Sequence, residues 1–114
     1  MAVQSVAQDE SCDGNTYETA VCLVRVLKRV DAELNTVYQT ALKVAKDPYT
    51  PADVQNLKDA ERKWIAYRDA ACKAERGLWG TGTGGPATHS ICLIRITELR
   101  IADLKTAYLL EPRN

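Results

Sequence analysis

The chain has 114 residues, of which 46% are apolar and 26% are charged. This composition is ordinary for one small globular domain, and it argues against disordered, collagen-like and low-complexity proteins. Fifteen Lys and Arg balance fifteen Asp and Glu. Because no basic block stands out, the sequence lacks the electrostatic signature of a nucleic-acid-binding protein.

The sequence contains neither a membrane span nor a recognisable signal peptide. Its longest apolar runs, such as residues 20–24, fall far short of the ~18 residues that a span needs. Residues 1–10 lack the basic and apolar regions of a secretory signal, which leaves either a cytosolic protein or an exported one whose signal has been removed. We expect a disordered N-terminal segment at 1–11, one helical domain at 12–110 and a tail at 111–114.

The first long helix is predicted from a cap at Asn15 to about Lys46. Asn15 precedes Glu18 by three residues, which is the spacing of a capping box. An apolar stripe at steps of three and four residues follows and is expected to face the core. Asp31 interrupts it, so a bend there would create a fourth, short segment. The stripe comprises Tyr17, Val21, Val24, Leu27, Leu34, Tyr38, Ala41 and Ala45.

A second helix is predicted after the proline-containing turn at residues 47–51. Thr50 suits the N-cap, and Pro51 suits the first helical position, where its missing N–H costs nothing. Glu61 and Arg68 stand seven residues apart on the side that carries Trp64, so two charged groups project toward the core. The expected apolar stripe comprises Val54, Leu57, Trp64, Ala71 and Leu78.

The third helix is predicted from about Ser90 to Leu110, with an apolar stripe that includes Ile94, Ile101, Leu104 and Tyr108. No stretch alternates with the period of two that is typical of strands. The sequence therefore predicts an all-α fold, an up-down bundle of three long helices.

Residues 77–86, GLWGTGTGGP, hold five of the six glycines, and positions 80–85 match G-x-G-x-x-G. A dinucleotide site needs a strand before this pattern, whereas a helix is predicted here, so we interpret the segment as a flexible loop. From this region Leu78, Trp79 and His89 are candidates for binding a partner protein. The alternative, in which Trp79 folds back onto the bundle, is favoured over its display.

The four cysteines follow the spacings C-x9-C and C-x19-C. Zinc knuckles use shorter separations, and a lone His89 is a poor fourth ligand, so disulfides are favoured over a metal site. Four cysteines allow three pairings. We favour Cys12 with Cys22 and Cys72 with Cys92, the second of which would fix the base of the glycine-rich loop.

The stretch ERKWIAYRDAAC, residues 61–72, resembles the LprI-like N-terminal domain family, bacterial secreted domains named for a lysozyme inhibitor. The similarity continues at residues 92–104, with C-L-x-x-x-T-x-x-R-x-x-x-L, and at residues 31–38, with D-x-x-L-N-x-x-Y. It implies an exported, helical, disulfide-bonded domain that binds and inhibits lysozyme. The chain departs from the family by lacking Asp-Pro after Cys22 and a lipobox before Cys12, so we expect a longer first helix and no lipid anchor.

The residues of these motifs also have an interpretation of their own. We expect a polar network across the three helices in which Arg68 pairs with Asp31 or Glu61, because partly buried arginines need partners. The alternative is a cleft in which Arg68, Arg100 and Tyr38 receive an acidic group of a glycan or protein. The expected members are Asp31, Tyr38, Glu61, Trp64, Arg68, Thr97 and Arg100, with Asn35, Tyr67 and Asp69 beside them.

No nucleophile and base can be paired in this sequence, so we expect neither an enzyme nor a cofactor. The function predicted is that of a periplasmic or secreted protein-binding module, a lysozyme inhibitor that occupies the cleft of the hydrolase. The alternative is a structural or envelope-associated helical domain that makes no contact with lysozyme.

Overall fold

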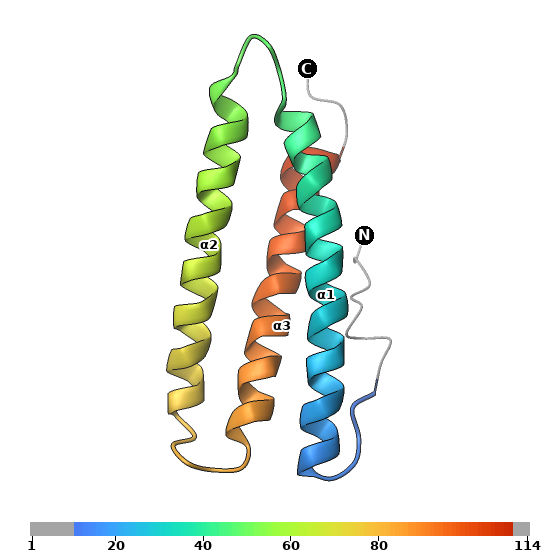
Figure 1. The fold of residues 1–114 in the computed structure, drawn as a ribbon, viewed down its shortest axis with the longest axis vertical. Helices are drawn as coiled ribbons and strands as arrows, with labels where there is room; N and C mark the ends of the chain where they lie inside the picture. Colours follow the sequence, from blue (N-terminus) through green and yellow to red (C-terminus); the bar gives the residue numbers. More distant parts are fainter. Residues whose placement is uncertain (1–10, 111–114) are drawn as a thin grey trace.

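The computed structural model describes residues 11–110; the N-terminal segment and tail predicted at 1–11 and 111–114 therefore lie almost wholly outside the described residues. Three long helices, α1 (Thr16–Ala45), α2 (Ala52–Gly77) and α3 (Gly85–Leu104), run up, down and up, and a short π-helix, η2 (Lys105–Leu109), extends α3. No strand occurs between residues 11 and 110. The predicted all-α bundle is confirmed (Figure 1).

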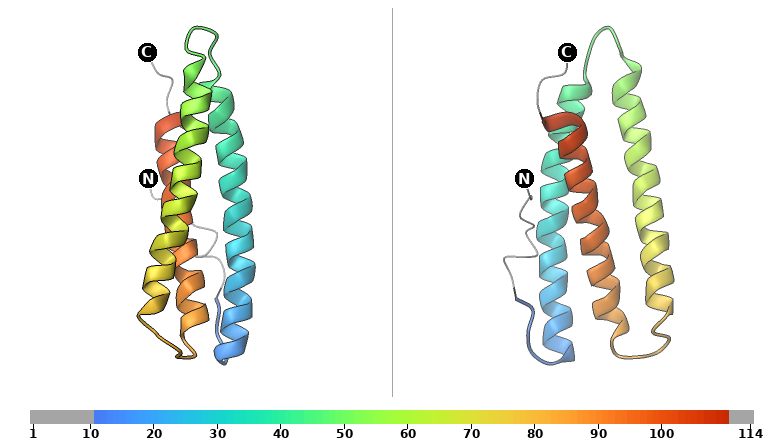
Figure 2. Two further views of the ribbon diagram at one scale, coloured as in Figure 1. Left: turned by 60° about the vertical axis from the view of Figure 1, so that its left-hand side comes forward. Right: turned by 180° about the vertical axis from the view of Figure 1, so that it is seen from behind.

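Helix α3 is the central element of the bundle. It lies between α1 and α2 in the front view (Figure 1) and again in the view from behind (Figure 2, right). Helices α1 and α2 contact each other much less than either contacts α3. The main core cluster joins apolar side chains of all three helices, among them Val30, Leu57 and Ile101. None of the helices in the described part of the chain is apolar over a length sufficient to cross a membrane.

Helix α1 begins as predicted and runs without a break. The Asn15 side chain accepts a hydrogen bond from the Glu18 N–H at 2.8 Å, and the Glu18 side chain accepts one in return from the Asn15 N–H. The predicted bend at Asp31 is wrong, because this residue faces away from the apolar side that packs on α3 and interrupts nothing.

The first half of the stripe predicted for α1 is also wrong. Tyr17, Val21 and Val24 are exposed, Tyr17 to 77%. A second apolar stripe, shifted by one or two positions, packs on α3 instead. In the first half of α1 it comprises Cys22, Val26 and Val30; in the second half it coincides with the predicted stripe, because Leu34, Ala41 and Ala45 are buried as expected, together with Val37. Both stripes have helical spacing, so periodicity alone does not choose between them.

Helix α2 begins at Ala52, one residue later than predicted, and no side chain caps it. The Thr50 carbonyl, rather than the Thr50 hydroxyl, accepts a hydrogen bond from the Asp53 N–H at 3.0 Å. Pro51 accordingly precedes the helix instead of occupying its first position. Leu78, predicted to end the apolar stripe, lies beyond the last residue of α2 and is exposed.

Helix α3 begins at Gly85, five residues before the predicted start at Ser90. Pro86 stands in its first turn, where helices have unpaired N–H groups and tolerate proline. The α-helix was predicted to continue to Leu110, but it ends at Leu104. The π-helix η2 covers the remaining residues, and the Leu110 N–H donates to the Lys105 carbonyl at 3.0 Å.

Two disulfides join the cysteines as predicted. Cys12–Cys22 ties the segment before α1 to that helix, and Cys72–Cys92 joins α2 to α3. Both cysteines of the second disulfide are fully buried. The second disulfide therefore holds the last turns of α2 against the first turns of α3, on either side of the loop that connects them.

Candidate functional site

Trp64, near the middle of α2, lies between two arginines. The guanidinium carbon of Arg68 stands 5.2 Å from the ring centre and that of Arg100 stands 5.9 Å away, within the range of cation–π attraction. Arg68 is one helical turn from Trp64 on α2, whereas Arg100 comes from α3. We refer to Trp64, the two arginines and their ion-pair partners as the Trp64 cluster.

Arg68 connects all three helices. Its Nε atom donates to Asp69 at 3.0 Å, and its Nη1 atom lies 3.4 Å from the Thr97 hydroxyl of α3 and 3.5 Å from the Asp31 carboxylate of α1. The sequence predicted that Arg68 would pair with Asp31 or with Glu61. The structure pairs it with Asp31, through a long contact.

Glu61 instead pairs with Arg100. The Arg100 Nε atom donates to Glu61 at 2.8 Å, and its Nη1 atom donates to Asp103 at 3.2 Å. Glu61 is only 7% exposed, and the Arg100 side chain is 13% exposed. This ion pair is largely buried, and it ties α2 to α3 across 39 positions of sequence.

A groove of about 320 Å³ separates α1 from α2 beside this cluster. Burial raises the pKa of the Asp31 carboxyl above its usual value, although Arg68 opposes that rise. Burial also raises the pKa of the Tyr38 hydroxyl, and the Glu61 carboxylate adds to the effect. We call this the α1–α2 groove; it is lined by Asp31, Leu34, Asn35, Tyr38, Glu61, Trp64, Ile65 and Arg68.

A second groove of similar size lies on the other side of Trp64, between α2 and α3. Tyr67 and Leu99 line it and are largely exposed, with Arg100 and Asp103 as its charged members. Trp64 therefore forms a wall shared by the two grooves, and its position is fixed by arginines that are themselves paired.

The glycine-rich segment forms a compact turn between α2 and α3. Leu78 is 86% exposed and Trp79 is 50% exposed. The Trp79 ring packs against Gly84, where an added Cβ would come within 2.8 Å of a ring carbon. Gly80 has a φ of +55°, a conformation that favours glycine. Trp79 thus rests on its own turn with half of its surface in solvent.

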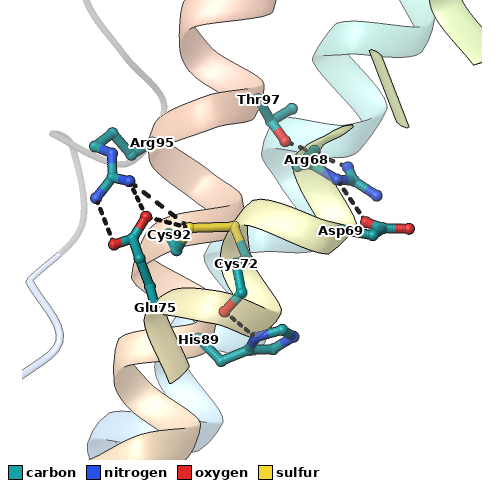
Figure 3. The surroundings of a disulfide bond; sticks show 8 residues. All are labelled: Arg68, Asp69, Cys72, Glu75, His89, Cys92, Arg95 and Thr97. Atoms are coloured by element: carbon teal, nitrogen blue, oxygen red, sulfur yellow. Dashed lines mark hydrogen bonds and ion pairs between the residues drawn. A yellow bond between two sulfur atoms is a disulfide. The ribbon is translucent and has the colours of Figure 1, made fainter. Parts of the chain in front are cut away.

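His89 lies within α3 instead of on this turn. Its Nδ1 atom is 3.4 Å from the Cys72 carbonyl, beside the buried disulfide (Figure 3). The structure therefore places Leu78 and Trp79 together and His89 apart from them, inside a helix.

An ion pair that the sequence reasoning missed covers the same disulfide. Arg95 of α3 binds the Glu75 carboxylate of α2 through both terminal nitrogens, and a Glu75 oxygen lies 3.0 Å from the Cys92 sulfur (Figure 3). Glu75 is three residues after Cys72, and Arg95 is three residues after Cys92. Because residues three apart in a helix lie on the same side, this equal spacing from the two cysteines could have predicted that Glu75 and Arg95 meet once the disulfide forms.

The described residues contain no group of three side chains able to hold a metal ion. The fold and these contacts define a disulfide-bonded, three-helix domain with two grooves on its surface and exposed apolar side chains, Leu78 and Trp79, on the turn between α2 and α3.

The chain belongs to the family described as "Lysozyme inhibitor LprI", whose profile matches residues 7–104. That description names an inhibitor family. The chain is also 30% identical over 94 residues to an uncharacterized protein of Rhizobium meliloti (strain 1021), covering 75% of this chain and 68% of the relative. No solved structure matches the chain.

Proposed function

We propose that this protein is an exported inhibitor of a lysozyme-like hydrolase and that the turn at residues 78–84 contacts the enzyme. The family match supports the class of target. The two disulfides support export, because disulfides persist in oxidising compartments outside the cytosol.

One observation carries the assignment to the turn. Leu78 and Trp79 expose large apolar surfaces at the end of the bundle, on a turn whose base is held by the buried Cys72–Cys92 disulfide. Ligand clefts are concave and mostly apolar, so a narrow projecting turn has the complementary shape. A turn fixed before binding also loses less conformational entropy on binding than a flexible one. By filling the cleft, it would exclude the polysaccharide.

The direct test is to titrate a chicken-type lysozyme, acting on cell walls, with the oxidised protein. We expect loss of activity that reaches completion near an equimolar ratio. Leu78→Ser and Trp79→Ser should each weaken inhibition by about tenfold or more, because aromatic and apolar anchors dominate interface energetics. Tyr49→Ser is the matched control, since Tyr49 is 91% exposed on the α1–α2 turn at the opposite end of the bundle (Figure 1).

Gly84→Ala tests the position of Trp79 without removing it. The new methyl group would displace the ring from its present seat, so we expect weaker inhibition with unchanged helix content by circular dichroism. Lysozyme activity that is unaffected by excess wild-type protein would refute the inhibitor proposal and favour a structural or envelope-associated domain. Equal inhibition by wild type and Trp79→Ser would remove the turn from the mechanism.

A further inference from the structure

The two disulfides of this protein lie in different surroundings. Cys72 and Cys92 are both fully buried, and we call their bond the buried disulfide. We call the bond between Cys12 and Cys22 the outer disulfide, because Cys12 is only half-buried and lines a surface groove of about 400 Å³ between α1 and α3. Exposed disulfides are the labile ones, whereas buried cysteines are inert. A thiol in solution therefore has easier access to the outer disulfide.

Two charged side chains cover the buried disulfide at its Cys92 end (Figure 3). The Oε2 atom of Glu75 lies 3.0 Å from the Cys92 sulfur, and the Nη2 atom of Arg95 lies 3.7 Å from it. The Glu75 side chain is 36% exposed and the Arg95 side chain is 51% exposed, so this pair separates the buried sulfur from solvent. Apolar side chains pack against the two cysteines elsewhere, among them Ile96.

The charge of this cover opposes the chemistry of reduction. A thiolate attacks one sulfur of a disulfide, and the other sulfur leaves as a thiolate. The Cys92 sulfur is therefore either the atom that an anion approaches or the atom that becomes an anion. The Glu75 carboxylate, the closer of the two charged groups, repels negative charge in both cases. Arg95 would attract it, but both of its terminal nitrogens bind Glu75.

We propose that the Glu75–Arg95 pair protects the buried disulfide from reducing thiols, so that the two disulfides open in a fixed order, the outer one first. Each reduction consumes two thiolates. The first forms a mixed disulfide and releases one cysteine thiolate, which takes a proton from water. The second attacks the sulfur of the bound reagent, releases the other cysteine in the same way and leaves as the reagent's own disulfide.

The order of opening has a structural consequence. Mild reduction would free the segment before α1 from that helix, while α2 and α3 stay joined on either side of the turn at residues 78–84. The order of reduction does not depend on lysozyme inhibition. Only the further expectation that a half-reduced protein still inhibits rests on the proposed function.

The test treats the full-length oxidised protein with mercaptoethanol at fixed pH and stops the reaction at intervals with iodoacetamide. Mass spectrometry of the digested protein then follows each disulfide separately. We expect the outer disulfide to be reduced about tenfold faster or more. Glu75→Gln keeps the size of the side chain and removes its charge, so it should speed reduction of the buried disulfide by about tenfold. Glu33→Gln is the matched control, because Glu33 belongs to another interhelical ion pair, with Lys105, and should leave that rate unchanged.

Charged thiols separate protection by charge from a loosening of the helices. Mercaptoethanesulfonate is anionic and cysteamine is cationic. If the Glu75 carboxylate acts through its charge, Glu75→Gln should raise the rate with the anionic thiol several-fold more than the rate with the cationic thiol. Looser packing would raise both rates by the same factor.

Three results would overturn the proposal: reduction of both disulfides at the same rate, no acceleration in Glu75→Gln relative to Glu33→Gln, or equal factors with the anionic and cationic thiols. The two proposals fail separately. Ordered reduction of a protein that does not inhibit lysozyme would refute the inhibitor proposal alone. Inhibition by a protein whose disulfides open together would refute the order of reduction alone.

Discussion

The buried pair of Glu61 and Arg100 offers the sharpest test of how the bundle is held together. Glu61→Met would leave the Arg100 guanidinium, 13% exposed, without its partner at 2.8 Å. Breaking a buried pair by removing one member costs about 3–5 kcal/mol. Arg100 keeps Asp103 at 3.2 Å and the Trp64 ring, so we expect the lower figure, about 3 kcal/mol.

Arg100→Met should cost a similar amount, because it leaves the Glu61 carboxylate buried and unpaired. The double variant should recover most of the loss and lie within about 1 kcal/mol of the wild type, since replacing both charges by apolar side chains is often close to neutral. A double-mutant cycle measures this coupling. The assay is urea unfolding, followed by tryptophan fluorescence and by circular dichroism.

Asp59→Asn provides the control, because Asp59 and Arg62 also lie 2.8 Å apart but on the surface. An exposed pair is worth about 0–1 kcal/mol. The reasoning would be refuted if Glu61→Met cost no more than Asp59→Asn, or if the losses in the Glu61 and Arg100 variants simply added. The Glu61–Arg100 and Asp59–Arg62 pairs have the same N–O distance and differ in burial. Either result would mean that burial does not set how much each pair contributes to stability.

Two further predictions concern other contacts of the same bundle. Replacing both Cys72 and Cys92 by Ser should lower the free energy of unfolding by about 3 kcal/mol, from the loop that the disulfide closes; a urea midpoint equal to that of the wild type would contradict this. The Asp31 carboxyl should titrate above 3.8, which ¹³C NMR of the carboxyl would measure, and a value below 3.8 would mean that Arg68 outweighs burial. Because the raised pKa favours the protonated native state, the contribution of Asp31 to stability is present at low pH and is lost as pH rises through that pKa. Asp31→Asn should remove this component from the pH dependence of unfolding.

The sequence by itself determined the helices and several of their ends. The Asn15 capping box, the proline-containing turn before Ala52 and the apolar spacing in each segment act over three or four residues, so they can be recognised without knowledge of the fold. Local pattern also excluded a dinucleotide site at the G-x-G-x-x-G match, because a helical stretch precedes it where such a site needs a strand. The cysteine spacings favoured the two disulfides that form.

Only the tertiary structure decided which side of each helix is buried and which charges meet. Helix α1 carries two apolar stripes of equal periodicity, and packing on α3 buries the one through Val26 and Val30 while leaving Tyr17 and Val24 in solvent. The choice of Arg100 rather than Arg68 as the partner of Glu61 depends on how α3 is placed beside α2. These contacts join residues far apart in sequence, so their energies depend on the packing of whole helices and not on local pattern.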